Sequence, residues 1–144
     1  MMRLLARSAL AGTAATLLAL ATGTSAHADG LDRTVWAGAD WNVTPHADSG
    51  GKAHIQTYGE IFTITDLAKD GHSTIGIISI GGEANTYYYW NRGGVDSTRT
   101  LNLDIKEGTP ITIKACIGDW KGNPDTPAAG IIWEKCSGWA QTDA

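Results

Sequence analysis

Short runs of alternating apolar and polar residues, separated by turn residues, constrain the fold of this chain more than any other feature. The clearest run is 101–105, where Leu, Leu and Ile alternate with Asn and Asp. Successive side chains of a strand point to opposite faces, so this alternation predicts a strand with one packed face and one wet face. Residues 110–115 repeat the pattern after Glu107-Gly108-Thr109. The spacing predicts a hairpin between these two strands.

Two earlier runs, 60–65 and 73–80, are rich in β-branched residues and predict a second hairpin. Their connector contains Asp70-Gly71, a strong turn dipeptide because Gly tolerates positive φ. Further short strands are expected at 34–37, 53–58, 86–90 and 130–136.

The fold class follows from these strands and from the absence of a helical pattern after residue 28. No segment there repeats apolar residues at spacings of three and four, and the chain contains 18 glycines. About eight short strands at intervals of roughly 8 to 12 residues are typical of all-β folds. We therefore predict a single antiparallel β-sandwich over residues 29–144, with a small β-barrel as the alternative.

Residues 1–28 have the pattern of a secretory signal peptide. Arg3 and Arg7 give a positive start, residues 9–21 are mainly Ala, Leu, Gly and Thr, and Ala26-His27-Ala28 fits a signal peptidase site. The apolar run is shorter than the roughly 20 residues that a membrane-spanning helix needs. We expect cleavage near Ala28-Asp29 and a secreted, extracellular protein.

Charge argues against nucleic acid as a partner. The chain holds 11 basic against 15 acidic residues, and Arg3 and Arg7 of the leader account for two of the basic ones. Binding to nucleic acid or to an anionic membrane depends on clustered Lys and Arg. The excess of acidic residues is better suited to keeping an exported protein soluble.

Cys116 and Cys136 are predicted to form a disulfide, because an even cysteine count in an exported protein is typical of one. Because side chains alternate along a strand, Cys116 should lie on the other face of its strand from Ile111, Ile113 and Ala115. The bridge is therefore expected on the solvent side or rim of the last strands and not between the sheets.

The chain has a single phenylalanine but six tryptophans: Trp36, Trp41, Trp90, Trp120, Trp133 and Trp139. Trp36, Trp90 and Trp133 lie in strand-like segments, where core packing is the commoner role. Trp120 lies beside a Gly- and Pro-containing loop, 118–129, where a large aromatic can either contact a ligand or fold back over the sheet.

The run Tyr87-Tyr88-Tyr89-Trp90 is the densest aromatic cluster. In a strand, Tyr88 and Trp90 share one face and Tyr87 and Tyr89 the other. Trp120, Tyr88 and Trp90 are the candidate ligand-binding residues, although cross-strand packing also explains such a run.

Signals for metals, cofactors and catalysis are weak. His46, His54 and His72 lack the close spacing of zinc ligands, and Asp66 and Asp70 do not match an EF-hand loop. No Gly-x-Ser-x-Gly motif occurs, and no glutamate pair is singled out for glycoside hydrolysis. We expect no metal, no cofactor and no catalytic residue.

The part of the chain after Ile64 resembles small secreted proteins of actinobacteria that have no assigned biochemical role. The segments that carry the resemblance are Thr65-Asp66, Asp70-Gly71-His72, Ile113-Lys114-Ala115-Cys116 and Cys136-Ser137-Gly138-Trp139. The resemblance implies a secreted, disulfide-bearing β-domain and brings no catalytic residues. It does not extend to residues 29–61.

The expected function is that of an exported, non-enzymatic binding or structural domain that recognises extracellular or cell-wall carbohydrate through aromatic residues. A protein-binding module, such as an inhibitor of secreted hydrolases, is the first alternative. A small secreted hydrolase is the second.

Overall fold

A computed structural model describes residues 30–38 and 49–144. The predicted signal peptide, 1–28, lies outside these residues, as do Trp41 and His46.

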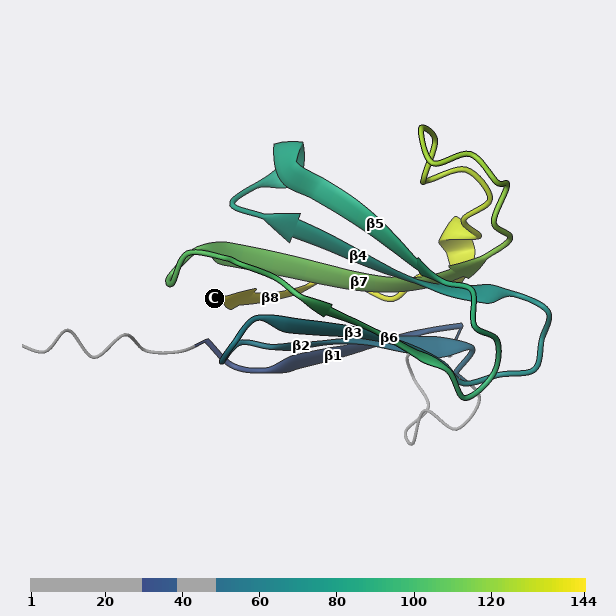
Figure 1. The fold of residues 1–144 in the computed structure, drawn as a ribbon, viewed down its shortest axis with the longest axis horizontal. Helices are drawn as coiled ribbons and strands as arrows, with labels where there is room; N and C mark the ends of the chain where they lie inside the picture. Colours follow the sequence, from purple (N-terminus) through teal and green to yellow (C-terminus); the bar gives the residue numbers. More distant parts are fainter. Residues whose placement is uncertain (1–29, 39–48) are drawn as a thin grey trace, which may run out of the picture.

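Two four-stranded antiparallel sheets form the structure (Figure 1). The first sheet has the order β1-β2-β3-β6 and comprises Arg33–Ala37, Gly51–Gln56, Ile61–Asp66 and Thr98–Asn102. The second has the order β5-β4-β7-β8 and comprises Thr86–Asn91, Ser73–Ile80, Pro110–Gly118 and Ala140–Asp143. Two short 3-10 helices, η1 (Glu83–Asn85) and η2 (Trp133–Lys135), complete the described elements. The predicted all-β sandwich is confirmed.

Alternation along the strands builds the core between the sheets. Ile55 and Phe62 from the first sheet and Ile78 and Ile113 from the second are fully buried there. Gly76 lets the sheets approach, because a Cβ at this position would lie 2.8 Å from the Phe62 ring. Truncating Phe62 to Ala would cost about 3–5 kcal/mol, as for other large buried aromatics.

Neither predicted hairpin forms. β3 and β4 lie in different sheets, and so do β6 and β7, so residues 67–72 and 103–109 cross from one sheet to the other. β3 pairs with β2 and β6, while β7 pairs with β4 and β8. The turn residues end the strands, as predicted, but in this sandwich the chain after each turn enters the other sheet and not a hairpin.

The strand predicted at 130–136 is wrong as well. Gly130 has φ +86°, Ile131 forms one isolated bridge with Gly118, and the chain then enters η2. The final strand is instead β8. Trp133 is accordingly exposed and not in the core.

Cys116 and Cys136 form the predicted disulfide. Its position follows strand parity: Ala115 and Ile117 face the core between the sheets, whereas Cys116 belongs to a second apolar cluster on the other face of β7. Cys116 is nevertheless fully buried, because residues 119–136 cover that face. In Figure 1 the loop after β7 lies on the side of its sheet that faces away from the first sheet.

Candidate functional site

The outer face of the second sheet carries a row of polar side chains that crosses all four strands. The register sets Ser79 of β4 opposite Thr86 of β5 and Thr112 of β7, and Thr112 opposite Gln141 of β8. With neighbouring strands about 4.8 Å apart, the row spans about 14 Å. We call Thr86, Ser79, Thr112 and Gln141 the polar row.

A groove of about 550 Å³ lies over the polar row. Its lining adds Tyr88 and Trp139 to the four polar residues, together with Gly82 and Pro110. The volume falls in the range of small-molecule sites, and the combination of aromatic rings with a few hydroxyl and amide groups is typical of them. The groove is the candidate binding site.

The two aromatic residues come from opposite edges of the sheet. Tyr88 belongs to β5, and Trp139 immediately precedes β8. Trp139 is 52% exposed, and the Lys114 ammonium lies 4.7 Å from the centre of its ring. Lys114 is two residues from Thr112 on the same face of β7, so the cation holds Trp139 beside the polar row.

Residues 119–136 cover the other end of this face. Trp90 is buried under this loop, with its Nε1–H donating to the Pro127 carbonyl at 2.8 Å. Trp120 packs edge-on against Trp90 at 5.3 Å. The same outer face thus changes from an open groove over the polar row to a closed apolar cluster at the disulfide.

The three predicted site residues therefore lie on one face but have different surroundings. Tyr88 lines the groove, Trp90 is buried, and Trp120 folds back over the sheet as a half-buried cover. As predicted, Tyr87 and Tyr89 occupy the opposite face, where their rings stack at 6.4 Å.

Sequence reasoning missed Trp139 and the polar row. Trp139 follows Gly138 outside any recognisable alternation, and the polar row exists only once four strands are in register. Trp36 was also expected in the core, but it lies on the outer face of the first sheet, half-buried, with the Lys52 ammonium 5.3 Å from its ring centre.

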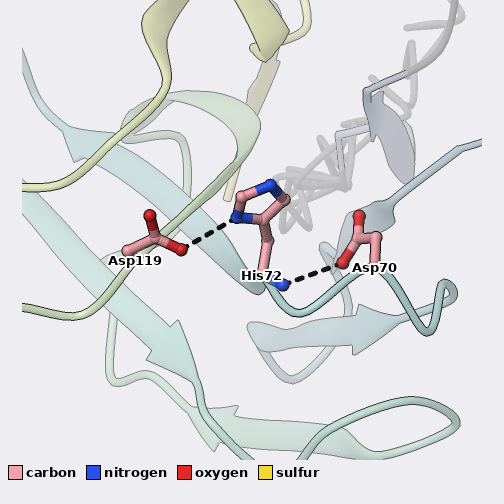
Figure 2. A network of polar contacts seen from close by, with 3 residues as sticks. All are labelled: Asp70, His72 and Asp119. Atoms are coloured by element: carbon pink, nitrogen blue, oxygen red, sulfur yellow. Dashed lines mark hydrogen bonds and ion pairs between the residues drawn. The ribbon is translucent and has the colours of Figure 1, made fainter.

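A polar network lies at the start of β4 (Figure 2). The His72 Nδ1 and an Asp119 carboxylate oxygen are 2.8 Å apart, and the His72 backbone N–H donates to Asp70 at 2.9 Å. The hydrogen bond from His72 lowers the pKa of Asp119. A His–Asp pair of this kind orients an imidazole, but a hydrolase also needs a nucleophile within hydrogen-bond reach of that ring. In the described ranges, Asp119 is the side chain bonded to it.

The other described side chains that were considered as metal ligands each form a hydrogen bond with a different group. His54, on the outer face of β2, bonds to the Thr34 hydroxyl at 2.8 Å. Asp66 and Asp70 each accept a backbone N–H within their own turn. Among residues 30–38 and 49–144, no group of three or more His, Cys, Asp or Glu side chains is placed to hold a metal ion.

Comparisons with protein-family models, with curated proteins and with solved structures find no match. None of the described helices is both long enough and apolar enough to cross a membrane.

Proposed function

We propose that this chain is an exported binding domain that holds extracellular or cell-wall carbohydrate in the groove over the polar row. The observation that carries the proposal is the placement of Tyr88 and Trp139 at opposite edges of a row of hydroxyl and amide groups. Sugar rings present apolar C–H faces and hydroxyl groups. Aromatic rings and short polar side chains are complementary to both.

Export is supported by two independent features. The leader pattern of residues 1–28 is that of a secretory signal, and the Cys116–Cys136 disulfide belongs to an oxidising compartment. The disulfide also links β7 to the loop that follows it and covers one end of the outer face of the second sheet. We call this segment the covering loop.

Binding without catalysis is supported by the chemistry of the groove. Its described lining consists of hydroxyl, amide, aromatic, Gly and Pro residues. Glycoside hydrolysis requires two carboxyl groups flanking the bond that breaks. The groove lining in the described part of the chain supplies neither of them.

Co-sedimentation with insoluble polysaccharides tests the proposal. Purified protein is mixed with cellulose, chitin, xylan and isolated cell-wall glycan, and the bound fraction is measured at increasing polymer concentration. We expect retention on at least one polymer. Tyr88→Ala and Trp139→Ala should each weaken it about tenfold, because each removes a stacking surface.

Trp133→Ala is the matched control. Trp133 is as exposed as Trp139, at 52%, but does not line the groove, so retention should not change. Retention that is lost equally in Trp133→Ala would contradict the groove as the site. A protein that binds none of the polymers but forms a stable complex with a secreted hydrolase would favour the protein-binding alternative.

A further inference from the structure

A second, smaller cleft of about 160 Å³ adjoins the groove at the β5 edge of the sheet. Its lining includes Tyr88, Trp90 and Trp120 together with Arg92 and Arg99. Tyr88 lines both the groove and this cleft. A ligand that follows the face past Tyr88 therefore reaches two guanidinium groups.

Both guanidinium groups are held in place by aromatic neighbours. Arg92 lies 5.4 Å from the centre of the Trp120 ring, and Arg99 lies 5.5 Å from that of Tyr89. Arg99 comes from β6 of the first sheet and donates through Nη1 to the Trp90 carbonyl at 2.8 Å. It therefore reaches across from one sheet to the edge strand of the other. Such contacts reduce the side-chain freedom that a bound ligand would otherwise have to remove.

The two charges have no acidic partner among the described residues, where the ion pair formed is that of His72 with Asp119. Two guanidinium groups in one aromatic cleft also stand out in a chain whose formal net charge is −4. Arginine presents five N–H donors in a planar fork, and the bond to Trp90 uses one nitrogen of Arg99. This fork matches the two oxygens of a carboxylate.

From this geometry we infer that the cleft binds the carboxylate of an acidic sugar, so that the ligand of the face is a uronate-bearing polysaccharide. The inference rests on the proposed function, because it names the class of carbohydrate that the groove would hold. Other rings of the polysaccharide lie over the polar row, Tyr88 contacts the ring at the junction, and the carboxylate of one uronate lies between Arg92 and Arg99.

Affinity electrophoresis with two soluble polymers tests the inference. Polygalacturonate carries a carboxylate on each ring, and highly methyl-esterified pectin keeps the chain while blocking that charge. We expect the protein to bind polygalacturonate about tenfold more tightly, the scale of one charge-assisted contact. Non-specific charge would act in the opposite direction, since protein and polymer are both acidic overall.

Arg92→Gln/Arg99→Gln should abolish the preference for polygalacturonate by lowering the affinity for this polymer to that for the esterified one. The double variant Lys69→Gln/Lys106→Gln, which makes the same change in net charge at exposed sites, should retain the preference. Arg92→Lys/Arg99→Lys keeps the charge without the fork and should retain only part of it. Thermal midpoints of all variants show whether the loss of Arg99 has unfolded the β5 edge.

Equal binding of wild-type protein to both polymers would overturn the acidic-sugar inference and leave the proposed function in place. A preference that survives in Arg92→Gln/Arg99→Gln but is lost in Lys69→Gln/Lys106→Gln would also overturn it. If wild-type protein binds neither of these polymers nor any of the insoluble ones, the proposed function fails and the inference fails with it.

Discussion

The Lys114 ammonium lies 4.7 Å from the centre of the Trp139 ring and links β7 to the residue that precedes β8. Half of the Trp139 surface is exposed, so packing against the protein fixes its ring only in part. The cation therefore contributes to the orientation of one of the two aromatic residues of the groove.

Lys114→Met should weaken carbohydrate binding while leaving the fold unchanged. The substitution keeps an unbranched side chain and removes the cation, whose attraction to an exposed ring is about 0.5–1 kcal/mol. We expect a two- to fivefold loss of affinity in the co-sedimentation measurement. Lys52→Met makes the same change beside Trp36 on the first sheet and should have no effect. An equal loss in both variants would show that net charge, not Trp139, is responsible.

Trp90→Phe should loosen the covering loop. Phe lacks the N–H that donates to the Pro127 carbonyl, and the loss of one partly buried hydrogen bond costs about 0.5–1.5 kcal/mol. Urea denaturation should show this loss, and limited proteolysis should cut within residues 119–130 sooner than in the wild type. Trp133→Phe, at an exposed position, should stay within about 0.5 kcal/mol of the wild type. Unchanged proteolysis of Trp90→Phe would show that other contacts hold the loop.

Removing the disulfide should lower the free energy of unfolding without changing the sheets. Cys116→Ala/Cys136→Ala opens a loop closed over a sequence separation of 20. In the chain-entropy model this costs about 3 kcal/mol. Urea denaturation measures the loss, and the far-ultraviolet circular dichroism should match that of the wild type. A loss below about 1 kcal/mol would indicate that the loop is held mainly by Trp90, Trp120 and Ile131.

The stability of the wild-type protein should fall as the pH rises through the titration of Asp66. Burial raises the pKa of this carboxyl above its ordinary value of 3.8, nearby Asp70 and Asp96 raise it further, and the Ala68 backbone N–H opposes them. A folded state that binds the proton more tightly is favoured most below 3.8 and loses that advantage as the pH passes the raised value.

Asp66→Asn removes the ionisation and can still accept the Ala68 N–H. The variant should match the wild type in acid and exceed its stability at neutral pH, as measured by urea midpoints across the pH range. Asp104→Asn, at an exposed position, serves as the control. A variant that is less stable than the wild type at neutral pH would show that the charged form of Asp66 is the stabilising one.

Strand alternation was sufficient to predict the sandwich, because inward-facing residues such as Ile111, Ile113 and Ala115 recur at every second position within one short segment. The same parity placed Cys116 outside the core. It could not choose partners for the strands, since Gly71 and Gly108 end a strand equally well in a hairpin and in a crossing between sheets. The polar row takes one residue from each of the four strands of the second sheet, and these residues become neighbours only when the strands pair. The groove was therefore out of reach until the register was known.

Trp133 was placed wrongly because tertiary structure overrides a local strand preference. Trp133 follows Ile131 and Ile132, a β-branched pair that favours a strand. The left-handed conformation of Gly130 and the return of the loop over β7 override that local preference. Trp120 was expected either to bind a ligand or to cover the sheet. Its ring does cover the sheet, packed edge-on against Trp90, and it also lines the smaller cleft, so ligand contact by Trp120 stays a prediction.

The groove is tested most directly as the binding site by nuclear magnetic resonance of the indole N–H signals of Trp139 and Trp133. Methyl-esterified oligogalacturonate is titrated, as are oligosaccharides of any polymer that retains the protein. The two side chains are equally exposed, so a difference between their signals does not come from a difference in solvent access. A ligand in the groove should shift the Trp139 signal in a saturable manner and leave Trp133 unchanged. Saturable shifts at Trp133, or in the first sheet with Trp139 unmoved, would contradict the assignment of the groove as the binding site.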